Sequence, residues 1–170
     1  MGVRNLIEKA KLWRLKKRGL KIGKNLKMYN TRIDYSHCFL IEIGNDVIIS
    51  NSTILAHDAT TKTALGKTKI GRVVIGNEVF IGFGSIILPN VQIGNNVIVA
   101  AGSVVTKNIP DNSMVAGVPA KIIGKTNEYI EKNRKLMKEV PVYDTYWKGK
   151  SEAEINRICH ELKSGFAFDE

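Results

Sequence analysis

Aliphatic residues recur at every sixth position through the middle of the chain. They are Ile43, Ile49 and Leu55, followed after a break by Ile75, Ile81, Ile87, Ile93, Val99 and Val105. An α-helix repeats its apolar positions about every 3.6 residues and a single strand alternates them, so neither explains a period of six. A coiled solenoid does, because three hexapeptides, each a short strand and a corner, close one triangular turn whose aliphatic side chains stack on the next turn.

Two other positions of the repeat hold small or β-branched residues. Four places after the aliphatic residues come Val47, Thr53, Ala59, Val79, Ser85, Val91, Val97, Ser103 and Ile109. The place directly after an aliphatic residue is often glycine, as at Gly44, Gly76 and Gly94, which suits a sharp corner. The alternative is a β-sandwich with coincidental spacing, and we reject it because all nine positions at the six-residue spacing hold Ile, Leu or Val. The sequence therefore predicts an all-β solenoid.

Two breaks interrupt the period. It extends weakly backward through Ile22 and Met28, but the step from Met28 to Ile43 is not a multiple of six, so residues are inserted or deleted there. A longer gap separates Leu55 from Ile75. We expect the segment near residues 60–68 to protrude from the coil as a loop that begins just after His57.

The termini are expected to be helical. The sequence divides into a basic N-terminal helix over residues 1–20, the β-helix over 21–124 and a helical extension over 125–170. Ser151 with Glu154 forms a capping box that begins a last helix. No apolar run has the length of a membrane span and the N-terminus lacks a signal-peptide pattern, which indicates a cytoplasmic protein. Two cysteines without metal-ligand spacing fit a reduced, structural role.

The net charge of +10 comes from one end of the chain. Residues 1–30 contain ten Lys or Arg and the single acid Glu8. One interpretation is a solvated helix face, and another is a peripheral contact with an anionic membrane surface. Nucleic-acid binding is not expected, because no recognition module is present and aromatic residues do not alternate with the basic ones.

The sequence resembles the hexapeptide-repeat acyltransferases. The resemblance lies in the repeats, in the runs Ile54–Asp58 and Ile75–Gly82, and in the ending Ala116–Lys121. The resemblance covers about residues 20–125 and favours the branch of maltose and galactoside acetyltransferases and polysaccharide O-acetyltransferases. It implies a left-handed parallel β-helix, a homotrimer with three sites between subunits, and acetyl-CoA as acyl donor with no metal. Neither the handedness nor the trimer follows from the period itself.

By this resemblance, His57 at the start of the protruding loop is the catalytic base. Imidazole has an ordinary pKa of about 6.5, so its neutral form can accept the proton of an acceptor hydroxyl at physiological pH. The alternative is a structural histidine. Asp58 either orients the imidazole ring or ends a turn.

The same resemblance predicts the residues that bind the donor. The acetyl-CoA set is Phe80, Phe83, Ala101, Thr106, Lys107, Gly117 and Lys121. Lys107 and Lys121 would meet the phosphates, unless they are only solvated. Many relatives carry tryptophan at the position of Phe80. Phenylalanine can pack against the cofactor but lacks the indole N–H donor. Asp34, Tyr35 and His37 lie in the irregular segment before Ile43, where they would line the acceptor site. In the alternative, Tyr35 and His37 close off the coil and Asp34 caps a turn.

The predicted function is acetyl-CoA-dependent O-acetylation of a sugar hydroxyl, in the synthesis of surface polysaccharide or another glycan. Acetylation of an amino sugar's nitrogen, or a small-molecule acceptor such as serine or an antibiotic, remains an alternative, as does a non-catalytic scaffold. A zinc site of the γ-carbonic anhydrase type needs three histidines. The sequence holds only His37, His57 and His160, widely spaced, which argues against it.

Overall fold

The computed structural model describes residues 3–170, with side chains from residue 10 onward. Residues 1–2 of the predicted N-terminal helix lie outside this range. The chain forms two compact units, residues 1–126 and 127–170, which are described separately below. Among the described helices, none has the length and apolar character that crossing a bilayer requires.

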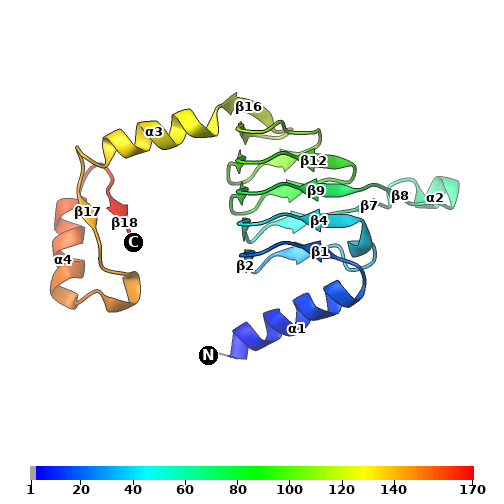
Figure 1. Ribbon diagram of the computed structural model, residues 1–170, viewed down its shortest axis with the longest axis horizontal. Coiled ribbons are helices and arrows are strands. Elements are labelled where there is room, and N and C mark those ends of the chain that lie inside the picture. The colour runs from blue at the N-terminus through cyan, green and yellow to red at the C-terminus, as the bar shows by residue number, and fades with distance from the viewer. Residues whose placement is uncertain (1–2) are drawn as a thin grey trace. The chain divides into compact units, whose positions relative to one another are not determined.

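The first unit is a coil of short strands in three parallel sheets (Figure 1). The coils contribute in turn β1 (Lys21–Ile22), β2 (Lys27–Tyr29) and β3 (Arg32–Ile33); β4 (Ile41–Ile43), β5 (Ile48–Ser50) and β6 (Thr53–Ile54); β9 (Val73–Ile75), β10 (Phe80–Ile81) and β11 (Ile86–Ile87); and β12 (Val91–Ile93), β13 (Ile98–Val99) and β14 (Val104–Val105). We call the sheets that start with β1, β2 and β3 the first, second and third sheets. The predicted β-solenoid is confirmed.

Aliphatic side chains of successive coils stack in register inside the tube. Ile43 pairs with Ile75 and Ile75 with Ile93 in the first sheet, and Ile81 pairs with Val99 in the second. All five are buried. Each fully buried aliphatic side chain contributes about 1.5–3 kcal/mol, so this stack supplies the main driving force for folding.

The predicted register is wrong at one corner of the second coil. Ile54, and not Leu55, pairs with Ile87 and is fully buried, while Leu55 is half-buried. The corner between Ile49 and Ile54 is one residue shorter than its counterpart from Ile81 to Ile87. Asn51 in this corner adopts a left-handed backbone with φ of 42°, a conformation that asparagine adopts more readily than most residues.

This shift also changes which small residue is buried. Ser52 is buried and Thr53 is half-buried, and the hydroxyl of Ser52 donates to the carbonyl oxygen of Gly82 at 2.9 Å. Ala59 is exposed, because the chain has left the coil before it reaches that residue. The other residues of the small and β-branched series are buried in the coil.

Asparagine and glycine stabilise the corner between the first and second sheets. The amide oxygen of Asn77 accepts from the backbone N–H of Asn45 at 2.8 Å, and that of Asn95 accepts from Asn77 at 2.8 Å. A Cβ added at Gly44 would lie 2.5 Å from the carbonyl oxygen of Gly76, so the coils approach too closely for any side chain there. These contacts explain the Gly-Asn pairs of the repeat.

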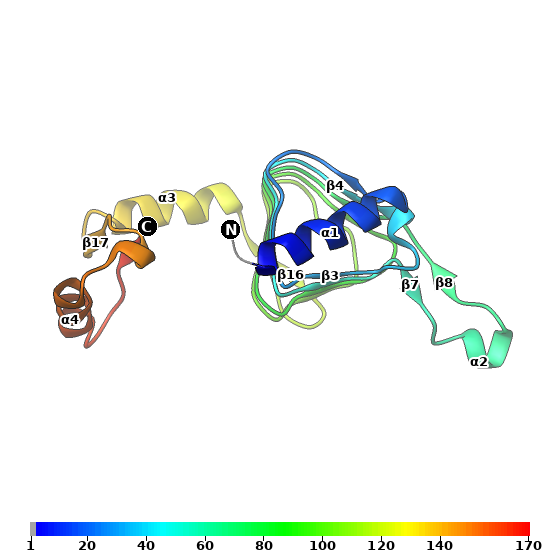
Figure 2. The same ribbon diagram turned by 90° about the horizontal axis from the view of Figure 1, so that it is seen from below.

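Both ends of the coil are covered. Helix α1 (Val3–Lys17) lies across the first coil, and Leu15 and Leu20 join the buried core (Figure 2). At the other end, β15 (Met114–Ala116) extends the second sheet and β16 (Lys121–Gly124) pairs antiparallel with it. The predicted N-terminal helix is confirmed for the described residues.

The second unit is small. The chain enters it along α3 (Thr126–Leu136) and continues through β17 (Val142–Tyr143), the 3-10 turn η2 (Trp147–Gly149), α4 (Glu152–Glu161) and β18 (Phe168–Asp169). The hydroxyl oxygen of Ser151 accepts from the backbone N–H of Glu154 at 3.2 Å, as the capping box predicts.

Two insertions leave the coil where the chain passes from the third sheet to the first. The first, between β3 and β4, contains the 3-10 turn η1 (Cys38–Leu40). The second, between β6 and β9, is an arm of β7 (His57–Asp58), α2 (Lys62–Leu65) and β8 (Lys69–Ile70) that projects outward (Figures 1 and 2). The predicted loop near 60–68 lies within this arm.

Replacing Ile54 with Ala is expected to lower the free energy of unfolding by about 2–5 kcal/mol, because it leaves a cavity in the stack. Leu55→Ala is the matched control and should cost less than about half as much, since Leu55 is half-buried. Urea denaturation followed by circular dichroism measures both. A larger loss for Leu55→Ala would contradict the observed register.

Candidate functional site

The two insertions bring Asp34, His37 and His57 together at one corner of the coil. The backbone N–H of Asp34 donates to the carbonyl oxygen of Ile54 at 2.9 Å, which sets Asp34 directly beside the start of the arm. A carboxylate oxygen of Asp34 lies 2.5 Å from Nδ1 of His57. The rings of His37 and His57 are 5.0 Å apart between centroids.

The carboxylate of Asp34 is buried and held by backbone N–H groups. Oδ1 accepts from Ser36 and His37, each at 3.1 Å, and Oδ2 accepts from Ala56 at 3.0 Å as well as from His57. Burial by itself raises the pKa of Asp34, but the hydrogen bonds from His57, His37 and Ala56 outweigh it and hold this pKa below its ordinary value. Asp34 is therefore a fixed anion at neutral pH.

This anion orients His57. A carboxylate can only accept, so Nδ1 of the neutral imidazole carries the proton and Nε2 carries the lone pair. The His57 side chain is 33% exposed. The pair is thus a histidine whose tautomer is fixed by a buried carboxylate, an arrangement suited to a general base.

The prediction that Asp58 orients the ring is wrong, and its alternative role in a turn is observed. Its carboxylate pairs with Nζ of Lys69 at 2.8 Å across the arm and accepts from the backbone N–H of Thr60 at 2.9 Å. The hydrogen bond from Lys69, followed by those from Thr60, lowers the pKa of Asp58. Asp58 stabilises the base of the arm, and Asp34 orients His57.

The other two predicted acceptor residues lie in the same insertion. Nδ1 of His37 lies 3.8 Å from Oδ1 of Asp34 and is buried without a hydrogen-bond partner among the described residues. The ring of Tyr35 is 55% exposed, and the guanidinium of Arg18 lies 4.4 Å from its centroid. Their contact with an acceptor stays a prediction.

The spacing argument that separated His37 from His57 is corrected by the structure. Together with Asp34 these residues offer three potential metal-ligand atoms within 4.8 Å of one another. Both oxygens of Asp34 are, however, already bonded to N–H donors, so the cluster is arranged as a hydrogen-bonded pair with a neighbouring histidine. His160 lies in α4 of the second unit.

The predicted donor residues lie on the third, fourth and fifth coils. Phe80 points outward from the second sheet, and Phe83, Ala101 and Gly117 follow one another along the corner between the second and third sheets. Thr106 and Lys107 come directly after β14, at the corner between the third and first sheets. The arm leaves this same corner on the second coil, and Lys121 begins β16. All seven are exposed. Their role in binding acetyl-CoA stays a prediction.

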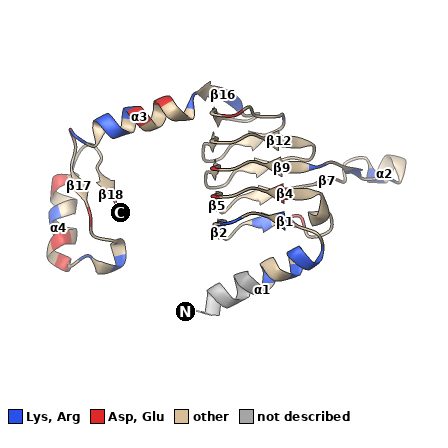
Figure 3. Cartoon of the chain, in the orientation of Figure 1, with Lys and Arg blue, Asp and Glu red and all other residues tan. Residues whose placement is uncertain are grey.

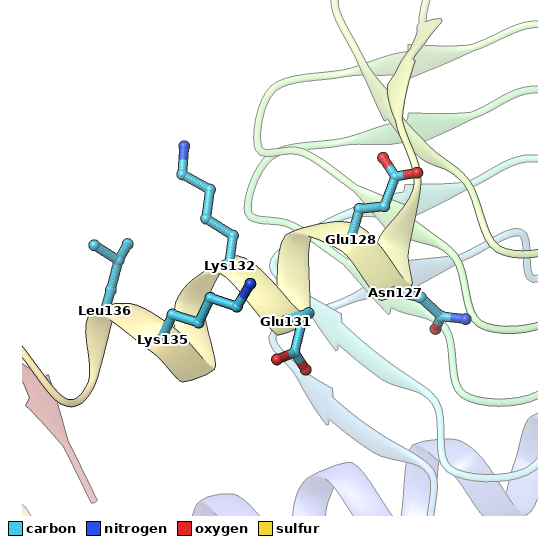
Figure 4. Close-up of a pocket in the computed structure, with 6 residues that line it drawn as sticks. All are labelled: Asn127, Glu128, Glu131, Lys132, Lys135 and Leu136. Atoms are coloured by element: carbon cyan, nitrogen blue, oxygen red, sulfur yellow. The ribbon is translucent and has the colours of Figure 1, made fainter.

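A surface hollow along α3 does not form a site. It is lined by residues of this one helix: Asn127, Glu128, Glu131, Lys132, Lys135 and Leu136. Figure 4 shows that these side chains point in different directions from the helix and do not converge.

Comparison with known proteins agrees with this fold. Residues 72–107 match the family model described as bacterial transferase hexapeptide, six repeats. Protein CapG of Staphylococcus aureus is 42% identical over 123 residues, which are 68% of this chain and 72% of CapG.

Two solved structures are also similar. The crystal structure of a maltose O-acetyltransferase from Clostridium difficile 630 is 31% identical, with a TM-score of 0.53 over 65% of this chain and 72% of that one. Serine acetyltransferase from Brucella abortus strain S19, solved in complex with coenzyme A, is 30% identical, with a TM-score of 0.50 over 64% of this chain. The match spans only 40% of that enzyme.

The depressed pKa of Asp34 predicts how stability depends on pH. In acid the unfolded chain takes up the proton first, so the stabilisation from Asp34 is complete above its ordinary pKa of about 3.9 and is lost as the pH falls through the lower, folded value. Asp34→Asn should flatten the decline of unfolding free energy between about pH 5 and pH 3. Urea denaturation across this range measures the slope.

Asp58→Asn provides the comparison, because the pKa of Asp58 is shifted in the same direction by a different set of bonds. The unfolding free energy of the double variant should depend less on pH than that of either single variant. An Asp34→Asn protein with the unaltered pH slope would show that the carboxylate is not held as described.

Proposed function

The chain belongs to the bacterial hexapeptide-repeat transferases, whose fold is the left-handed parallel β-helix, and we propose that it transfers an acetyl group from acetyl-CoA to a sugar hydroxyl. It is an acyltransferase, and the proposal concerns its donor and acceptor. The observation that carries the proposal is the bond between Asp34 and Nδ1 of His57, which leaves Nε2 to take a proton.

The reaction is a direct transfer. Nε2 of His57 removes the proton of the acceptor hydroxyl as its oxygen attacks the thioester carbonyl carbon. Asp34 stabilises the imidazolium that forms and keeps the ring in place. When the tetrahedral intermediate collapses, the carbon–sulfur bond breaks and the thiolate takes the proton from His57, which returns the base to its neutral form.

The donor is proposed to lie along the corners of the third to fifth coils. Backbone groups near Ala101 and Gly117 would face the pantetheine arm, and Lys107 and Lys121 would meet the phosphates. Support comes from the coenzyme A complex of the related serine acetyltransferase. Phe83, with 63% of its surface exposed, is suited to packing against a second copy of the chain, and we propose a homotrimer.

A sugar hydroxyl is proposed as acceptor because the related C. difficile enzyme is a maltose O-acetyltransferase. An amine on an amino sugar would use the same base and remains the alternative. A non-catalytic scaffold does not account for a buried carboxylate that fixes the tautomer of an accessible histidine.

Replacing His57 with Ala is expected to lower kcat by about 10²–10⁴-fold, the usual loss when a general base is removed. The assay follows thiol release from acetyl-CoA with a panel of sugars, amino sugars and serine. His160→Ala, which removes an exposed histidine of the second unit, should behave as the natural protein. Turnover that survives the loss of His57 would overturn the proposed mechanism.

A further inference from the structure

Helix α1 presents a row of basic side chains beside the first strand of the third sheet. Lys11, Arg14 and Arg18 are spaced three and four residues apart, so they share one face of the helix. Nζ of Lys11 donates to the carbonyl oxygen of Thr31 at 3.0 Å, and Nε of Arg18 donates to that of Tyr35 at 3.2 Å. These two bonds align the helix with the segment Thr31–Tyr35, so Arg14 lies between them.

Arg32 adds a fourth positive charge to this row. It lies in β3 between the buried residues Thr31 and Ile33, and its side chain is exposed. We call Lys11, Arg14, Arg18 and Arg32 the basic strip. Figure 3 shows Lys and Arg along the described part of α1 and on the first coil.

The strip is not neutralised within the described part of the chain. None of its four side chains forms an ion pair with a carboxylate of residues 10–170. The segment Thr31–Tyr35, along which the strip lies, contains one acidic residue, Asp34. This carboxylate is buried and already bonded to His57. Arg18 is held over the Tyr35 ring by its bond to Tyr35, which fixes the guanidinium before any ligand arrives.

Along the coil, the strip lies on the side of His57 away from the predicted donor residues. It follows the first coil, whereas His57 leaves the second coil and the predicted donor residues lie on the third to fifth. Tyr35, at the end of the strip, is the residue after Asp34. From Lys11 to Arg18 the helix rises about 10 Å, which is long enough to face more than one phosphate group.

We propose that the basic strip binds the phosphate groups of the acceptor, so that the acetylated sugar is one carried on a diphosphate. The guanidinium groups of Arg14 and Arg18 match phosphate oxygens in pairs, and Lys11 and Arg32 add charge. The diphosphate could belong to a nucleoside or to a lipid, because both present the same anion. This inference rests on the proposed function for the identity of the reacting group.

Binding is tested first without turnover. Inorganic pyrophosphate is titrated into the full chain by calorimetry, with coenzyme A at saturation so that the donor site is occupied. The double variant Arg14→Gln/Arg18→Gln should bind pyrophosphate at least about tenfold more weakly, since each charge-assisted hydrogen bond contributes appreciably. Lys16→Gln, an exposed change on another face of the same helix, is the control and should bind as before.

Turnover is then compared with one sugar in three forms: free, as a nucleoside diphosphate derivative, and as a lipid diphosphate in neutral vesicles. KM for a diphosphate form should be the lowest, and Arg18→Gln should raise it about 10- to 100-fold while changing the KM of the free sugar little. Arg18→Lys keeps the charge and should recover part of the loss. Whichever diphosphate form has the lower KM identifies the carrier.

Different results separate the two proposals. If pyrophosphate binds equally to the Arg14/Arg18 variant and the natural protein, the basic strip is not a phosphate site. If the free sugar is acetylated as efficiently as both diphosphates, the inference is overturned while the acetyltransferase proposal stands. If the strip variants lose pyrophosphate binding but no acceptor is acetylated, the strip is supported and the proposed reaction fails.

Discussion

The site depends on the in-register stacking of parallel strands in neighbouring coils. Because Ile33 pairs with Ile54, the residues that follow them leave the third sheet at the same corner on neighbouring coils. Asp34 and the arm that begins with His57 therefore meet, although they are far apart in the chain. The apolar stack thus does more than stabilise the coil, since it positions a carboxylate from one coil against an imidazole from the next.

Two opposing effects act on that carboxylate. Burial disfavours the charged form of Asp34, while the N–H donors around it favour this form, and the net effect lowers its pKa. Three of those donors are backbone groups, whose positions follow from the coil and not from side-chain rotamers. A base oriented in this way loses little energy to reorganisation when it takes up a proton, because its counter-ion is already in place.

The repeat predicted most of the coil, but the sequence could not predict its contacts between coils. Ile54 and Leu55 are adjacent aliphatic residues, so composition could not reveal that the corner between Ile49 and Ile54 is one residue shorter. Asp58 was a candidate partner for His57 because it is adjacent in sequence. The sequence predicts the actual partner, Asp34, only as an acceptor residue or a turn cap, because its place beside His57 follows from the register of the first coil, where the six-residue period is weakest.

The order of features along the coil fits the proposed direct transfer. The basic strip follows the first coil, His57 leaves the second, and the predicted donor residues occupy the third to fifth. In the proposed reaction, the acceptor and the thioester meet beside the imidazole of His57. A single general base then suffices, because no acyl group has to be stored on the protein between two half-reactions. Such an order needs only that the two insertions share a corner, which the stacking of the first two coils provides.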